Sequence, residues 1–232
     1  MTTVTAVIPV FNDAAYLAEA LRSVLDQTRP PTQVLVVDDG STDASAEVAR
    51  GFAPQVELIA QANQGIGGAR NTGIAAASGD LIAFLDADDV WPLNSLQVRL
   101  EAMEADPSLA AAYGASEHFF SPDLDEAKRA QLHLPQGHAH ARFAGAMLIR
   151  RRIFDEIGLF DPSLRVGEMI DWTSRLQDSG ARIGKIDALV MRRRIHGDNT
   201  VIRERPSHGD YLKALRASVA RKAAAARDAG AA

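Results

Sequence analysis

The chain has 232 residues, of which 47% are hydrophobic and 24% charged, so it is long enough to bury a substantial core as one ordinary globular domain. The formal net charge is -5, so the chain has no excess of lysine and arginine of the kind that nucleic-acid binding requires. The sequence contains no cysteine, which excludes disulfides, thiolate nucleophiles and thiolate zinc sites.

Two short runs rich in β-branched residues, 4–8 and 34–37, are predicted to be buried parallel strands. A helix is expected between them, because its apolar residues recur at the spacing of one helical face. These residues are Leu17, Ala20, Leu21, Val24 and Leu25.

The alternation of strands and helices continues to residue 85. A helix opened by 41–43, a strand at 56–60, a helix at 67–77 and a strand at 81–85 are expected next. This pattern predicts an α/β fold with a mostly parallel central sheet flanked by helices. Ligands of such sheets bind beyond the carboxyl ends of the strands, where two acidic clusters stand, at 38–39 and 86–89.

The second half of the chain is less regular. We expect a helix at 93–104, a strand at 109–113, a loop with a short helix at 121–140, a strand at 146–149, helices at 151–157 and 170–178, a strand at 189–194 and a helical tail from 211. Residues 1–95 and 96–205 are interpreted as two halves of one domain, and 206–232 as a C-terminal helical tail. The acceptor of any reaction is expected to lie along 114–142.

The strongest chemical signal is the pair Asp86 and Asp88, which directly follows an apolar strand. Two carboxylates at this spacing can share Mg²⁺ or Mn²⁺, which prefer oxygen ligands and retain open positions for phosphate. Such a cation stabilises a departing diphosphate as a Lewis acid. The alternative interpretation is an acidic turn or helix cap.

A second acidic site and a glycine-rich segment support the first interpretation. Asp39 can accept hydrogen bonds from a base or ribose, and Arg70 and the amides that precede its helix can face phosphate. Taken alone, Gly65, Gly67 and Gly68 indicate only a turn. The segment is not a dinucleotide fingerprint, because Arg70 stands where the third glycine belongs.

Together these segments resemble the family 2 glycosyltransferases, which have the GT-A fold. The resemblance rests on five motifs with agreeing order and spacing, namely VIPVFN at 7–12, VVDDGSTD at 36–43, NQGIGGARN at 63–71, GD at 79–80 and FLDADD at 84–89. A weaker similarity extends to about residue 199.

The resemblance implies a metal-assisted hexosyltransferase that inverts the anomeric carbon of a nucleoside diphosphate sugar, with a UDP-sugar as the expected donor. Pro9, Val10 and Phe11 would line the base pocket, Asp39 would contact the base or ribose, and Arg70 and Asp86 would lie by the sugar nucleotide. By the same resemblance, Asp88 would be the direct ligand of Mn²⁺ or Mg²⁺, and His196 would lie near the metal and the diphosphate.

An inverting reaction needs a base for the proton of the acceptor, and a carboxylate is the usual one. The family usually shows Gly-Glu-Asp at the position of Gly167, but Met169 replaces the aspartate here. Glu168 and Asp171 are three residues apart and would face the same side of a helix. We expect Asp171 to be the base and Glu168 to support the acceptor or the metal; Glu168 as a helix-capping residue is the alternative.

Two other functions compete with a glycosyltransferase. Met169 would suit a nucleotide-sugar-binding protein with weakened catalysis, and the α/β plan with a metal would suit a nucleotidyltransferase. No signal peptide or stretch of roughly 20 apolar residues is found, so a cytoplasmic protein with at most peripheral membrane association is expected. The acceptor, whether saccharide, lipid-linked or peptide, is not encoded in any motif.

Overall fold

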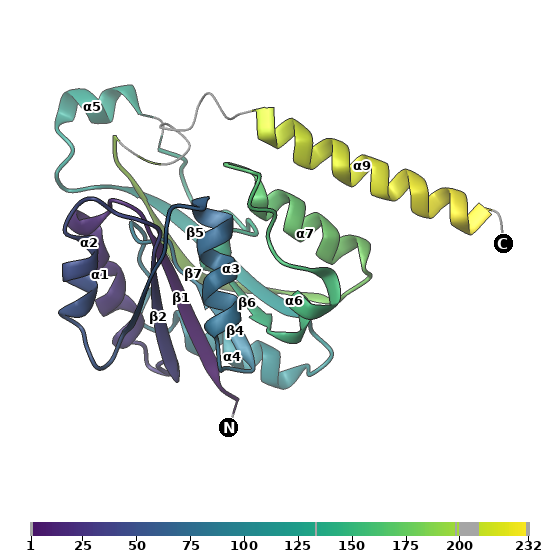
Figure 1. Ribbon diagram of the computed structural model, residues 1–232, viewed down its shortest axis with the longest axis horizontal. Coiled ribbons are helices and arrows are strands. Elements are labelled where there is room, and N and C mark those ends of the chain that lie inside the picture. Colours follow the sequence, from purple (N-terminus) through teal and green to yellow (C-terminus); the bar gives the residue numbers. More distant parts are fainter. Residues whose placement is uncertain (1, 133, 198, 200–208, 231–232) are drawn as a thin grey trace.

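The computed structural model describes residues 2–132, 134–197, 199 and 209–230 (Figure 1). These residues form a seven-stranded sheet with the order β3-β2-β1-β4-β6-β5-β7. The strands are β1 (Val4–Val10), β2 (Gln33–Asp38), β3 (Glu57–Ala60), β4 (Leu81–Phe84), β5 (Ala111–Phe120), β6 (Met147–Arg150) and β7 (Ile183–Ile195). β6 runs antiparallel to β4 and β5, whereas the other pairings are parallel, which confirms the predicted α/β class with a mostly parallel sheet.

Helices cover both faces of the sheet. They are α1 (Ala14–Leu25), α2 (Ser45–Arg50), α3 (Gly65–Ala76), α4 (Ser95–Ala105), α5 (Glu126–Gln131), the 3-10 turn η1 (Ala144–Ala146), α6 (Arg152–Ile157), α7 (Glu168–Asp178) and α9 (Gly209–Gly230). One buried cluster joins α1 and α4 to the sheet, and a second joins α3, α6 and α7 to it. Successive residues of β1 divide between the clusters, with Ala6 and Ile8 in the first and Val7 in the second, because side chains alternate across a strand.

The first half of the chain forms as its pattern predicts. Leu17, Ala20, Leu21 and Val24 are the buried residues of α1 and pack on the sheet. α3 lies close to the sheet because it carries a glycine where it crosses β1: a Cβ on Gly73 would stand 2.2 Å from Val7 Cγ1. This close approach holds the first turn of α3 over the ends of β1 and β2.

Two strands of the second half are longer than predicted. β5 continues to Phe120 and β7 begins at Ile183, so the pair forms a long parallel ladder with a register shift near Ala115. α7 also begins at Glu168, two residues before the expected start. Its N-cap, Gly167, has φ 84°, a left-handed conformation that glycine adopts without steric cost.

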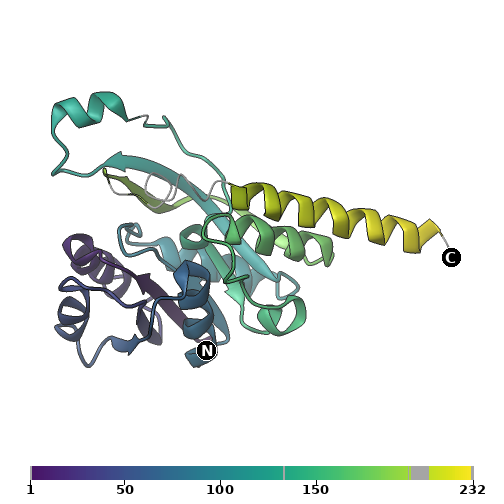
Figure 2. The same ribbon diagram turned by 45° about the horizontal axis from the view of Figure 1, so that its top comes forward.

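The C-terminal helix α9 lies beside α7 and extends past it, as the two views show (Figures 1 and 2). Ser174 donates to Ser218 at 2.6 Å, and the Arg165 amide donates to Asp210 at 3.0 Å. Within the described residues, no helix is both long enough and apolar enough to span a bilayer.

Candidate active site

A cavity of about 320 Å³, called the strand-end cavity below, lies at the carboxyl ends of β1, β2 and β4. This is the edge at which the acidic clusters were expected to converge, since parallel strands end there together. Eight of the candidate site residues line it: Pro9, Val10, Phe11, Asp39, Arg70, Asp86, Asp88 and Glu168.

Asp39 is held rigidly beside the end of β1. Its Oδ1 accepts from Gln61 Nε2 at 2.7 Å and from the Gln64 amide at 2.8 Å, and Asn63 Nδ2 donates to its carbonyl at 3.0 Å. The side chain is 3% exposed. A buried carboxylate that is fixed by several donors is suited to orient a polar ligand.

Arg70 connects the acidic loop after β4 to the start of α7. Its Nη2 donates to Asp86 Oδ1 at 2.7 Å and its Nη1 to Glu168 Oε1 at 2.6 Å. The guanidinium also lies 5.8 Å from the ring centre of Phe84 and 5.7 Å from that of Phe160. Burial alone would lower the pKa of Arg70, but the charges of Asp86 and Glu168 raise it above its ordinary value, so Arg70 is a permanent cation.

Asp88 lines the cavity and contacts His196, which is buried and does not itself line the cavity. His196 Nε2 lies 3.0 Å from Asp88 Oδ2, and Asn199 Nδ2 donates to the same oxygen at 3.2 Å. Asn199 Oδ1 in turn accepts from the His196 amide at 2.7 Å. These contacts hold a carboxylate and an imidazole at one point, although the described residues contain no cluster of three such ligands.

The neighbouring Asp89 is buried and accepts from the Arg194 amide at 2.9 Å. Burial raises its pKa well above the ordinary value, and the charges of Asp88 and Asp86 raise it further. Asp89 therefore holds its proton more readily than an exposed aspartate does.

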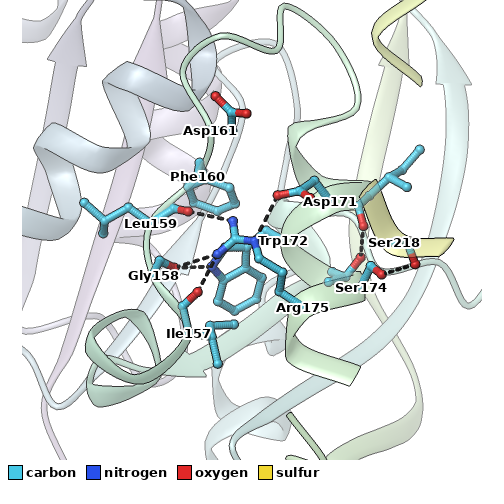
Figure 3. Close-up of polar contacts among 12 residues, drawn as sticks. Ile157, Gly158, Leu159, Phe160, Asp161, Asp171, Trp172, Ser174, Arg175 and Ser218 are labelled. Carbon is cyan, nitrogen blue, oxygen red and sulfur yellow. Dashed lines mark hydrogen bonds and ion pairs between the residues drawn. The ribbon is translucent and has the colours of Figure 1, made fainter. Parts of the chain in front are cut away.

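Asp171 lies away from the cavity in a different network (Figure 3). Its Oδ2 accepts from Arg175 Nε at 2.9 Å and its Oδ1 from Arg221 Nη1 of α9 at 3.2 Å. Arg175 also donates to the carbonyls of Ile157 and Leu159, both at 2.6 Å. Asp171 thus joins α7, α9 and the loop after α6, while Glu168 is the carboxylate of α7 that lines the cavity.

The amino-acid sequence was compared with protein families and with individual known proteins. The sequence profile described as Glycosyl transferase family 2 matches residues 5–158. The chain belongs to glycosyl transferase family 2. This confirms the resemblance carried by the strand-end motifs.

Individual relatives extend the family match beyond residue 158. The uncharacterized glycosyltransferase EpsJ of Bacillus subtilis is 29% identical over 229 residues, which cover 90% of this chain and 66% of that protein. Glycosyltransferase AglE of Haloferax volcanii is 30% identical over 193 residues, or 76% of this chain and 62% of that protein. The chain therefore spans about two thirds of the length of these two relatives.

Among solved structures, residues 1–349 of S. aureus TarS in complex with UDP-GlcNAc superpose with a TM-score of 0.74 at 18% identity. The match covers 94% of this chain and 66% of that one. At this identity the likeness concerns the fold, and it identifies the GT-A fold expected from the sequence.

This family 2 chain builds its site partly from residues that the motifs did not indicate. Asn199 contacts the Asp88 carboxylate, and four further side chains line the cavity: Phe143, Met191, Arg193 and Tyr211. Asn199 follows His196 by three residues, a weak signal of a shared turn. The other four stand in segments without a recognisable motif, so no spacing in the sequence predicts that they converge.

Proposed function

We propose that this family 2 chain transfers a sugar from a nucleoside diphosphate sugar to an acceptor hydroxyl, with inversion at the anomeric carbon and assistance from a divalent cation. The observation that carries this proposal is the convergence of Asp39, Arg70, Asp86, Asp88 and Glu168 on one cavity.

The donor is assigned to the side of the cavity formed by β1 and β2. Pro9, Val10 and Phe11 offer an apolar wall for the base, and Asp39 offers a fixed carboxylate to its polar edge or to the ribose. A UDP-sugar is the donor that we favour, because TarS, which has the same fold, is described in complex with UDP and with UDP-GlcNAc.

The metal is assigned to Asp88 and His196, with Mn²⁺ or Mg²⁺ as the ion. A carboxylate oxygen and an imidazole nitrogen 3.0 Å apart form a mixed donor set that suits Mn²⁺, and two protein ligands leave positions for phosphate oxygens. When bound, the cation would supply a Lewis acid for the charge on the departing diphosphate. Asp86 is engaged by Arg70, so we assign to this pair the orientation of the sugar diphosphate.

We assign the base to Glu168. The acceptor oxygen attacks the anomeric carbon, the bond from that carbon to the diphosphate oxygen breaks, and the acceptor proton passes to the Glu168 carboxylate. Glu168 lines the cavity, whereas Asp171, the base expected from the sequence, is held by Arg175 and Arg221 outside it. The geometry therefore favours the second of the two candidates.

A thermal-shift panel of UDP, GDP and ADP, each with and without Mn²⁺, tests the donor site. A nucleotide at about 100 times its Kd stabilises a protein by about 2.7 kcal/mol, which for this size corresponds to a rise in Tm of roughly 5–10 °C. We expect UDP with Mn²⁺ to give the largest rise, and Asp88→Ala to abolish the Mn²⁺-dependent part. The matched control is Asp155→Ala on α6, away from the cavity. If none of the nucleotides raises Tm with or without the metal, the proposal is wrong.

A further inference from the structure

A second cavity of about 480 Å³ adjoins the strand-end cavity. We call it the side cavity; its lining residues come from β5, from the segment before η1 and from α7. Phe143, Met169 and Ile170 line both cavities, so the two meet next to Glu168. A molecule in the side cavity would therefore reach the group to which we assign proton abstraction.

Two arginines make cation–π contacts with aromatic side chains where the two cavities meet. The Arg142 guanidinium lies 5.4 Å from the ring centre of Tyr113, and that of Arg193 lies 5.2 Å from the ring centre of Phe143. Arg142 lines the side cavity and Arg193 the strand-end cavity. An aromatic face fixes a guanidinium without using its N–H groups, which remain directed at other acceptors.

Arg142 and Arg193 differ from Arg192 and Arg194 in whether they pair with a carboxylate. Arg192 pairs with Glu117 at 2.6 Å and Arg194 with Glu19 at 2.6 Å. Arg193, between them, has no carboxylate partner in the described part of the chain, and neither has Arg142, whose guanidinium contacts the side-chain amide of Gln177. Neither positive charge is thus neutralised by a carboxylate of the described residues, although Arg142 shares N–H groups with a neutral amide.

Charge is divided between the two ends of the joined cavities. The strand-end cavity is lined by carboxylates, including Asp86, Asp88 and Glu168, which suit a metal. His118 lines neither cavity but packs edge-on against Phe143; burial lowers its pKa, and the positive charge of Arg193 lowers it further. Among the described residues no carboxylate lines the side cavity; the exposed Asp187 pairs at 3.3 Å with His140, which does line it. The side-cavity end is consequently the one that favours an anion.

We propose that the side cavity binds the acceptor, and that this acceptor carries an anionic group, a phosphate or a carboxylate, close to its attacking hydroxyl. The inference rests on the proposed function, because it places the acceptor beside Glu168. Arg142 and Arg193 bind the anionic group, since arginine forms paired hydrogen bonds with planar or tetrahedral oxyanions. Tyr113 and Phe143 hold the two guanidinium groups in place.

Calorimetric titration of the protein saturated with UDP and Mn²⁺ tests this assignment, because the donor site is then filled. The probes are glucose 6-phosphate, glucuronate and glucose. We expect at least one of the two anionic probes to bind roughly tenfold or more tightly than glucose, in line with hydrogen bonds to charged groups. The tighter of glucose 6-phosphate and glucuronate identifies the anionic group as phosphate or carboxylate.

Variants separate a role in binding from a role in folding. Arg142→Met should remove the preference for the anionic probe, and Arg142→Lys should retain part of it, while UDP binding stays unchanged in both. Arg152→Met, which changes an exposed arginine of α6 paired with Glu156, is the matched control and should leave all three probes unaffected.

The inference is overturned if glucose binds the UDP-loaded protein as tightly as the anionic probes, if none of the three probes binds, or if Arg142→Met keeps the preference. Failure of UDP itself to bind would instead contradict the proposed function. The two failures are therefore distinguishable in one set of titrations.

Discussion

Replacement of Glu168 by glutamine should lower kcat by roughly 10²–10⁴-fold, which is the usual contribution of a general base. Glutamine has nearly the same size but has no carboxylate to take the acceptor proton. The measurement is initial-rate release of the nucleoside diphosphate from the donor that the thermal-shift panel identifies, at saturating donor and acceptor. Circular dichroism on the same sample reports whether the fold is retained.

Asp171→Asn is the matched comparison, because it makes the same chemical change three residues along α7. We expect kcat to stay within about fivefold of the wild type, since Asp171 lies outside the cavity. The substitution should instead lower the free energy of unfolding, because Arg175 and Arg221 lose the charged partner that they share. The opposite outcome, a folded Asp171→Asn protein without turnover and an active Glu168→Gln protein, would assign the base to Asp171.

Replacement of Arg70 by methionine should lower the free energy of unfolding by about 3–5 kcal/mol, the cost of breaking a buried ion pair from one side. Arg70 is 2% exposed, and its removal leaves the carboxylates of Asp86 and Glu168 facing each other without a cation. Urea unfolding monitored by fluorescence of the two tryptophans measures this change.

Arg99→Met provides the control for the loss of a buried arginine. Arg99 is fully buried, but its guanidinium donates to the carbonyls of Ser95, Gly145 and Met147 and to the Ser95 hydroxyl, and burial lowers its pKa to about 9. Because its removal leaves these buried carbonyls without this donor, at about 1–3 kcal/mol each, we expect a loss of similar size although no ionised partner is left unpaired. A loss below about 1 kcal/mol for Arg70→Met would show that the carboxylates do not depend on Arg70.

The position of the site could be predicted because its acids follow buried strands directly. Asp39 comes after β2 and Asp86 after β4, and both strands are parallel neighbours of β1, so their ends meet at one edge of the sheet. Local hydrophobic pattern was sufficient for this step. The contact between Asp88 and His196 joins residues 108 positions apart, and only the family resemblance indicated that His196 belongs to the candidate site.

Which of Glu168 and Asp171 lines the cavity could not be predicted from their spacing. Three residues on a helix place both on the same side, but Gly167 turns the chain so that α7 starts at Glu168, by the cavity. Asp171 faces α9 instead, where Arg221 stands 50 residues away in the sequence. A tertiary contact with a distant helix therefore decided the environment of this carboxylate.

The lengths of β5 and β7 were underestimated for a similar reason. Their added residues do not alternate between apolar and polar; Glu117 and His118 in β5 face Arg192 and Arg193 in β7 in the parallel register. The ladder is supported there by the Glu117–Arg192 pair and by arginines placed on aromatic rings, such as Arg192 over Phe119 at 4.8 Å. Cross-strand pairing of this kind is invisible in either strand alone.

We propose that Asp88 and His196 hold a divalent cation against the diphosphate of the donor. A crystal of the protein grown with UDP and MnCl₂, with data collected at the manganese absorption edge, tests it directly. We predict an anomalous peak in contact with the Asp88 carboxylate, the His196 imidazole and oxygens of the diphosphate. UDP bound in the strand-end cavity without a peak there, or with manganese held by other residues, would contradict it.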